Sequence, residues 1–238
     1  MPVRTNRVTS AALRLVLKSA EVSAVRDDGP LRTIELTGPD LADQAWTPGD
    51  KLRIHVGRFD LRTYTPICWD GARGRTQLIA YVHGDGPGVT WCRDARAGVE
   101  CLVLGPSRSV RLDELDGPPI LVGDETSIGL SVAWRTLGSA GPIAEVFELT
   151  DQPGTRPALD SLGLGAATVV ERQPDDGHLE RLADLVVEQV RAHPDAPLCL
   201  TGRAPTIAAV RRRLKDAGLS DRRHRAKAYW DPKRAGLD

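Results

Sequence analysis

The sequence predicts two domains of different fold class: an antiparallel six-stranded Greek-key β-barrel over residues 1–116, then a parallel-sheet α/β domain over residues 117–238. Two observations favour this division. Short β-branched and leucine-rich segments separated by turn residues fill the first half, and strand-like segments alternate with helical ones in the second. The pattern changes at the turn Asp116-Gly117-Pro118-Pro119, which marks the domain boundary.

The expected barrel strands share a high content of leucine or β-branched residues. They span residues 13–25, 32–37, 51–56, 62–67, 77–82 and 100–104. Turn formers such as Asp28-Gly29-Pro30 and Pro48-Gly49-Asp50 separate them, and one short helix is expected near residues 88–95. Six strands at this spacing indicate a closed barrel.

The second half is expected to form a parallel sheet with crossover helices. Buried strands are expected at 120–123, 143–149, 167–171 and 198–202, and helices at 126–137, 178–192 and 205–217. In the helix 178–192, apolar residues recur every three or four positions. These residues are Leu179, Leu182, Leu185, Val186 and Val190. They predict the face that packs against the sheet.

Composition excludes several classes of protein. The hydrophobic fraction is 41% and the charged fraction 27%, which is ordinary globular usage and unlike a disordered chain. No apolar run approaches the ~20 residues needed to span a bilayer, and no signal sequence is apparent, so a cytoplasmic location is expected. The four cysteines include no Cys-x-x-Cys pair, and we therefore expect no metal site.

The segment Arg62-Thr63-Tyr64-Thr65 lies on an expected barrel strand. Side chains alternate along a strand, so Arg62 and Tyr64 should share one face and Thr63 and Thr65 the other. Arginine holds a diphosphate through paired charge-assisted bonds, and tyrosine offers a flat ring for an isoalloxazine. The alternative is that these side chains only decorate an exposed strand.

A glycine-rich turn follows the next expected strand, in the run from Tyr81 to Trp91. The free N–H groups at the helix start form a site for a diphosphate, and Gly86 and Gly88 allow close approach. A second strand-to-helix turn is Gly123-Asp124-Glu125-Thr126.

Together these motifs resemble the siderophore-interacting proteins, a family of FAD-binding ferric-siderophore reductases in the ferredoxin–NADP reductase superfamily. The resemblance covers residues 13–236. It rests on five motifs in the family's order: Arg62-Thr63-Tyr64-Thr65, His83-Gly84-Asp85-Gly86-Pro87 with Trp91, Gly105-Pro106, Gly123-Asp124-Glu125-Thr126 and Tyr229-Trp230.

The resemblance implies a ferredoxin reductase-like fold and a bound FAD. Arg62 would hold the diphosphate, Tyr64 would stack on the flavin and Thr65 would bond near its reactive N5. The full set of expected cofactor-binding residues is Arg62, Thr63, Tyr64, Thr65, Val82, His83, Gly86, Gly88, Val89, Thr90, Trp91, Asp124, Thr126 and Trp230. No catalytic residue is expected beyond the flavin-contacting Tyr64 and Thr65. For His83 the alternative is a structural role, and for Tyr229 and Trp230 it is packing between the domains.

Three positions depart from the family pattern. Val89 stands where the family usually has Ser or Thr, so the diphosphate contact would be mostly backbone. Thr201-Gly202-Arg203 replaces the usual Ala-Gly-Glu, and Gly129 lies near the place of a missing proline. The last two changes fall in the donor-binding domain and leave the identity of the electron donor open.

Charge is balanced overall, with 32 basic and 32 acidic residues, but residues 203–234 hold eleven Lys or Arg against three Asp. This excess of eight positive charges indicates an anionic partner. The expected docking residues are Arg203, Arg211, Arg212, Arg213 and Lys227. The partner would be the 2′-phosphate of NADPH, an acidic ferredoxin or an anionic siderophore; the alternative is a solvated helix face. The cluster has no interleaved aromatics, which argues against nucleic acid.

The expected function is reduction of a ferric siderophore or another ferric chelate, with electrons from NADH, NADPH or ferredoxin, by a monomer. A flavin takes up a hydride and releases electrons singly, as ferric iron requires. The lower charge of ferrous iron weakens its binding by hard oxygen ligands. Two alternatives stay open: a flavin-dependent reductase for a quinone, free flavin or partner protein, and a non-catalytic flavin-binding module.

Overall fold

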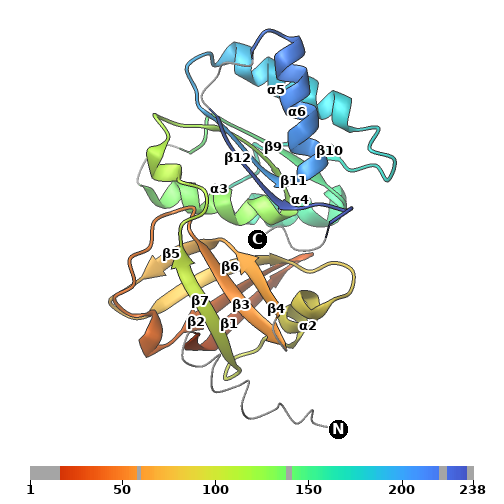
Figure 1. The fold of residues 1–238 in the computed structure, drawn as a ribbon. Coiled ribbons are helices and arrows are strands. Elements are labelled where there is room, and N and C mark those ends of the chain that lie inside the picture. Colours follow the sequence, from red (N-terminus) through yellow and green to blue (C-terminus); the bar gives the residue numbers. More distant parts are fainter. Residues whose placement is uncertain (1–16, 58–59, 138–140, 220–223, 235–238) are drawn as a thin grey trace.

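The computed structural model describes residues 17–57, 60–137, 141–219 and 224–234, and it contains two sheets (Figure 1). An antiparallel sheet of seven strands forms the N-terminal half, and a parallel sheet of five strands forms the C-terminal half. The chain therefore has the predicted β-then-α/β architecture. No helix among the described residues is both long enough and apolar enough to cross a membrane.

The antiparallel sheet is strongly curled and follows the order β4-β3-β7-β1-β2-β6-β5. Its strands are β1 (Lys18–Asp28), β2 (Leu31–Thr37), β3 (Lys51–Gly57), β4 (Asp60–Tyr64), β5 (Pro66–Asp70), β6 (Arg75–Tyr81) and β7 (Glu100–Ser107). Helix α2 (Pro87–Asp94) lies between β6 and β7 in the chain. The first predicted strand, 13–25, starts outside the described residues and continues to Asp28.

The expected count of six strands was one short, because the predicted strand 62–67 is broken at Thr65. Before the break, Tyr64 pairs with Leu52 of β3; after it, Pro66 pairs with Leu78 of β6. Pro66 has no N–H to continue the first ladder. Since β4 and β5 are the two edges of the sheet and Thr65 alone joins them, the edges meet at this residue. Counted as one bent strand, they complete a circuit of six.

The barrel core follows from the alternation of apolar side chains along these strands. Leu52 and Ile54 of β3 are fully buried, as are Ile34 of β2, Leu78 of β6 and Val103 of β7. They belong to one hydrophobic cluster, against which Tyr64 and Trp91 pack from its border.

The parallel sheet has the order β10-β9-β8-β11-β12. Its strands are β8 (Ile120–Asp124), β9 (Ala144–Leu149), β10 (Thr168–Glu171), β11 (Leu198–Arg203) and β12 (His224–Trp230). Its helices are α3 (Ile128–Trp134), α4 (Gln152–Ser161), α5 (Leu179–Ala192) and α6 (Ala204–Asp216). Four short 3₁₀ turns, η1 to η4, cover Pro39–Leu41, Leu112–Glu114, Glu125–Ser127 and Arg135–Leu137. The predicted helix 126–137 is thus one α-helix with a 3₁₀ turn at each end.

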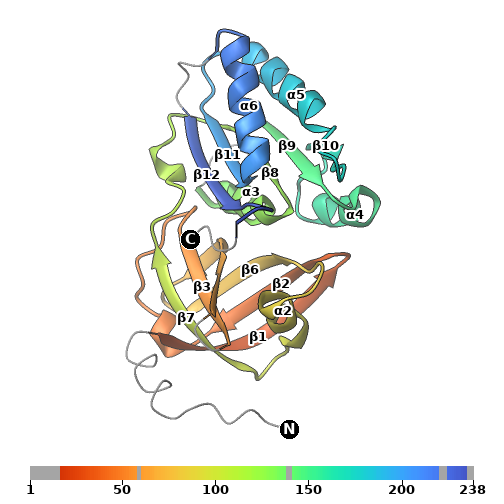
Figure 2. The ribbon, with the colours of Figure 1, turned by 45° about the vertical axis from the view of Figure 1, so that its right-hand side comes forward.

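Helices cover both faces of this sheet (Figure 2). Helices α5 and α6 pack on one face, where the predicted stripe residues Leu182, Val186 and Val190 are buried. On the other face, α3 and α4 share a hydrophobic cluster with the barrel, in which Ile67 and Ile79 pack with Ile128. This shared cluster packs the second face of the sheet, through α3 and α4, against the barrel.

The strand order brings the carboxyl ends of β8 and β11 together as neighbours, and the connections leave them toward opposite sides of the sheet. Ligands of open α/β sheets bind at such a crevice. In this chain the carboxyl edge faces the barrel. A Cβ on Gly129 of α3 would lie 3.2 Å from the Thr65 carbonyl oxygen, so α3 touches the barrel where its edges meet.

Candidate functional site

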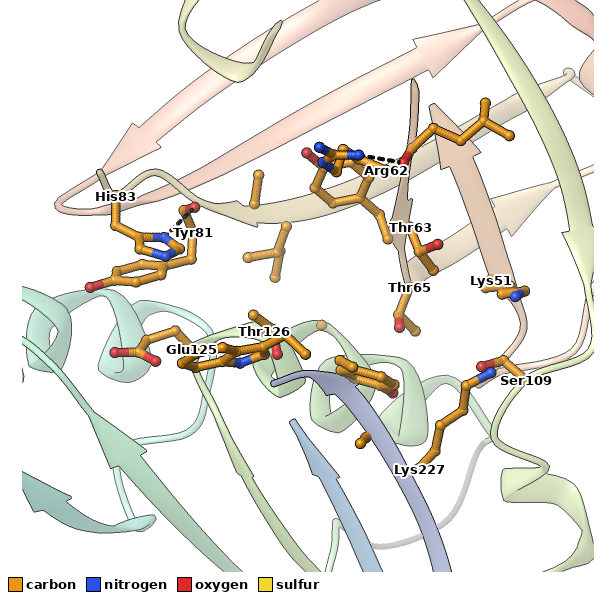
Figure 3. A pocket seen from close by; sticks show the side chains of 18 of the residues that line it. Lys51, Arg62, Thr63, Thr65, Tyr81, His83, Ser109, Glu125, Thr126 and Lys227 are labelled. Carbon is orange, nitrogen blue, oxygen red and sulfur yellow. Dashed lines mark hydrogen bonds between the residues drawn. The ribbon is translucent and has the colours of Figure 1, made fainter. Parts of the chain in front are cut away.

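A cavity of about 480 Å³ lies between the barrel and the carboxyl edge of the parallel sheet (Figure 3). Both domains contribute side chains to its wall. The predicted site residues that line it are Arg62, Thr63, Tyr64, Thr65, His83, Thr126, Lys227 and Trp230. Residues up to 168 positions apart in the sequence, from Arg62 to Trp230, therefore meet in one site.

Arg62 lies against the start of α2. A Cβ on Gly88 would be only 2.9 Å from the Cγ atom of Arg62, so glycine leaves the room that this side chain occupies. Gly86 caps α2 without a side-chain hydrogen bond, and Pro87 has no N–H. The N–H groups of the first helical turn have no partner within the helix. A guanidinium and a helix N-terminus thus border the same space.

Val89 and Thr90 offer little side-chain chemistry at this helix start. The Thr90 hydroxyl donates a 3.0 Å hydrogen bond to the carbonyl of Gly86, one turn back in the same helix. Val82 packs at the border of the barrel core, and its N–H donates to the Pro30 carbonyl at 2.8 Å. The Thr90 hydroxyl and the Val82 N–H are thus both engaged in contacts within the protein.

Tyr64 reaches from β4 toward α2. Its hydroxyl lies 3.2 Å from the Cys92 sulfur, and its ring centroid lies 5.9 Å from that of Trp91. Burial raises the pKa of the Tyr64 phenol far above its usual value. The ring therefore stays neutral while it lines the cavity.

A second aromatic surface stands at another part of the cavity (Figure 3). The rings of Tyr81 and His83 are stacked, with centroids 4.3 Å apart and planes 21° apart. His83 Nδ1 also lies 3.3 Å from the Tyr81 carbonyl oxygen. Tyr81 was missed from the sequence, although it shares a strand face with the lining residue Ile79.

Trp230 and Asp124 join neighbouring parts of the carboxyl edge. The indole Nε1 of Trp230 donates a 2.6 Å hydrogen bond to Asp124, whose carboxylate also accepts the N–H of Thr126 at 2.9 Å. Asp124 is fully buried, and this burial raises its pKa to about 6. Asp124 thus holds Trp230 in the cavity wall without reaching the cavity itself.

Two arginines lie close to the Trp230 ring. The guanidinium carbons of Arg172 and Arg203 lie 5.4 and 5.8 Å from its centroid. Arg172 donates to Glu125 at 2.8 Å, and Arg203 donates to Asp176 at 2.6 Å. Sequence reasoning missed Arg172 and Glu125 as lining residues. Their signal was position, since each directly follows a parallel strand.

The remaining basic residues divide into two groups. Lys227 of β12 lines the cavity together with Lys51 of β3, a residue the sequence analysis missed (Figure 3). Arg211, Arg212 and Arg213 lie on α6 and line no part of it. Arg211 lies 2.9 Å from His224, at the opposite end of β12 from Trp230.

Arg213 and Tyr229 each contact neighbouring parts of the α/β domain. Arg213 donates to Asp184 of α5 at 2.6 Å, so its charge is paired across the two helices. Tyr229 lines the cavity next to Trp230 but packs into a core cluster behind it, and burial raises the pKa of its hydroxyl.

Comparison with known proteins identifies the barrel. Residues 2–110 match the model of the siderophore-interacting FAD-binding domain family. None of the curated proteins matches the chain.

Three solved structures illustrate the shared fold. The siderophore-interacting protein SipS from Aeromonas hydrophila is 20% identical with a TM-score of 0.70, covering 91% of this chain and 98% of that one. A siderophore utilization protein from T. fusca is 23% identical with a TM-score of 0.67, covering 94% and 96%. Phthalate dioxygenase reductase, described as a modular structure for electron transfer from pyridine nucleotides to [2Fe-2S], is 16% identical with a TM-score of 0.67, covering 89% and 68%.

At these identities the likeness to solved structures establishes the fold, which is ferredoxin reductase-like. The family match covers residues 2–110 and therefore assigns the barrel, as a domain, to the siderophore-interacting FAD-binding domains.

Proposed function

We propose that this protein is an FAD-dependent reductase that reduces a ferric siderophore or another ferric chelate and so releases ferrous iron. The observation that carries the proposal is a cavity in which the Arg62-to-Thr65 segment of an FAD-binding barrel faces the carboxyl edge of a parallel sheet. A cofactor on the barrel and a donor at the sheet edge would meet there.

The residues at the cavity fit FAD. The space that Gly88 leaves beside Arg62 suits a diphosphate, which would be held by the guanidinium and by the N–H groups at the start of α2. Tyr64 offers a neutral ring surface and Thr65 a hydroxyl in the same wall. Bound FAD would supply the conversion between two-electron and one-electron transfer.

The chain itself would bind and orient the reactants. Lys51, Lys227 and Arg234 border the cavity and favour an anionic substrate such as a ferric chelate with acidic ligands. The carboxyl edge of the parallel sheet would receive the electron donor, which is NADH, NADPH or a ferredoxin. The domain limits 1–116 and 117–238, the monomeric state and the cytoplasmic location also remain predictions.

The test is a spectrum followed by turnover. Purified protein should bind FAD with absorbance near ~450 nm and lose that absorbance on anaerobic addition of a donor. Ferric chelates should then restore it, with ferrous iron captured by a colorimetric chelator. Reoxidation only by a quinone, free flavin or a partner protein would indicate another acceptor. Failure to bind FAD in a folded protein would refute the proposal.

A further inference from the structure

The side chain of Cys92 contacts the hydroxyl of Tyr64, the residue that the proposed function places beside the flavin. Cys92 lies in α2 and is 2% exposed, and its sulfur is 3.2 Å from the Tyr64 hydroxyl oxygen. Burial raises the pKa of the Cys92 thiol as well as that of the Tyr64 phenol. Both groups therefore keep their protons, and the contact is a neutral hydrogen bond in which one donates and the other accepts.

This contact adds a directional restraint at the tip of a ring that also packs against the barrel core. Tyr64 ends β4, immediately before the break at Thr65, so its backbone lies at the limit of a ladder. From α2, Trp91 packs beside the ring at an interplanar angle of 43°, and Cys92 meets its tip. Residues of one helix, α2, thus contact both the side and the hydroxyl end of the Tyr64 ring.

The same helix also borders the proposed diphosphate site. Gly88 lies against Arg62 in the first turn of α2, one helical turn before Cys92. A rigid helix that touches both Arg62 and Tyr64 fixes the distance between the two parts of the cofactor site.

We propose that Cys92 is a positioning residue, whose hydrogen bond to Tyr64 fixes the orientation of the ring that lines the flavin site. Cys92 itself is buried and does not line the cavity. The inference rests on the proposed function in that it places the flavin beside Tyr64. It adds a residue that the known family motifs in this sequence do not include.

The chain supplies a matched control. Cys101 is also buried, at 7% exposure, and belongs to the same barrel core cluster as Cys92. Cys101→Ala removes the same sulfur from the same core without touching Tyr64. Cys92→Ser retains a hydrogen-bonding group and serves as the conservative variant.

The first measurement needs no flavin. The chain has three tyrosines, so ring-labelled tyrosine gives few NMR signals, and Tyr64→Phe assigns those of Tyr64. In apoprotein, Cys92→Ala should shift the Tyr64 ring signals and speed its ring flips, whereas Cys101→Ala should leave them in place. Unchanged Tyr64 signals in folded Cys92→Ala would overturn the proposal.

The second measurement uses the FAD-loaded protein. Cys92→Ala should shift the visible flavin spectrum and midpoint potential while FAD affinity changes less than about threefold. Cys92→Ser should return both toward wild type, and Cys101→Ala should match wild type. A Cys101→Ala effect equal to that of Cys92→Ala would mean a general packing defect and overturn the proposal. Failure of wild type to take up FAD would instead refute the proposed function, whatever the tyrosine spectra show.

Discussion

The indole N–H of Trp230 donates a 2.6 Å hydrogen bond to the buried carboxylate of Asp124, which joins the end of β12 to the end of β8. The strand β11 lies between these two strands, so the bond crosses the carboxyl edge of the sheet. It holds the Trp230 ring close to the guanidinium groups of Arg172 and Arg203. The wall of the cavity on the side of the parallel sheet is thus set by a carboxylate that solvent does not reach.

This burial gives the first prediction, which concerns pH. Burial raises the pKa of Asp124 to about 6, above the ~3.9 of an aspartate in the unfolded chain, so folding favours the protonated form. The contribution of protonated Asp124 to the free energy of unfolding is complete below about pH 4 and is lost as the pH rises through 6. At pH 7 the loss is on the order of 2 to 3 kcal/mol.

Asp124→Asn keeps the shape and removes the titration. We therefore expect the stability of wild type relative to Asp124→Asn to fall between pH 4 and pH 7. Urea unfolding at several pH values measures this difference. A difference that stays constant over that range would place the titration in another group.

The second prediction is that Arg62→Ala weakens FAD binding about tenfold. The guanidinium is exposed in the absence of ligand, so the lost charge-assisted bond is worth roughly 1.5 kcal/mol. Equilibrium titration of apoprotein with FAD measures the affinity. Arg96→Ala is the control, because Arg96 is an exposed arginine just beyond the other end of α2. Equal affinities in the two variants would move the diphosphate site elsewhere.

The third prediction separates helix stability from cofactor binding. Gly88→Ala should leave the protein as stable as wild type or slightly stabilise it, since alanine favours helix over glycine by about 1 kcal/mol. The new Cβ would stand 2.9 Å from Arg62 Cγ and push that side chain aside, so FAD affinity should fall severalfold. Thermal unfolding and FAD titration are to be compared with Val89→Ala. An unaffected FAD affinity in Gly88→Ala would show that the close approach is not needed.

The fold could be predicted from the sequence where a local pattern reports it. Alternating apolar residues mark the barrel strands, and the stripe through Leu182, Val186 and Val190 marks α5. The break at Thr65 was missed because the apolar and β-branched residues around it favour one strand, although Pro66 was a local signal against a continuous ladder. The break becomes visible only in the strand pairing, because the residues before it pair with β3 and those after it pair with β6. Helix α4 was missed because Pro153, Gly154 and Pro157 are poor helix formers.

The candidate site was predictable only in part, for a similar reason. The Arg62-to-Thr65 segment and the start of α2 each carry a local motif. Tyr81 and the Cys92 thiol carry none, and Arg172 is marked only by its position after a strand. All three gain a role from contacts between residues far apart in the chain. The basic excess near the C-terminus shows the limit most clearly, since sequence position alone did not separate Lys227 from the arginines of α6.

The last prediction tests these two basic groups against each other. Lys227→Gln should raise the KM for an anionic ferric chelate severalfold, because Lys227 lines the cavity and its charge acts on encounter. Added salt should imitate the variant, since the Debye length is about 10 Å at 0.1 M. Neutralising Arg211, Arg212 and Arg213 together should leave the KM for that chelate and for NADH or NADPH unchanged, since α6 carries them away from the cavity. A rise in KM confined to reduced ferredoxin would support docking of a protein donor on α6. A rise for the chelate in the triple variant, with none in Lys227→Gln, would reverse the assignment.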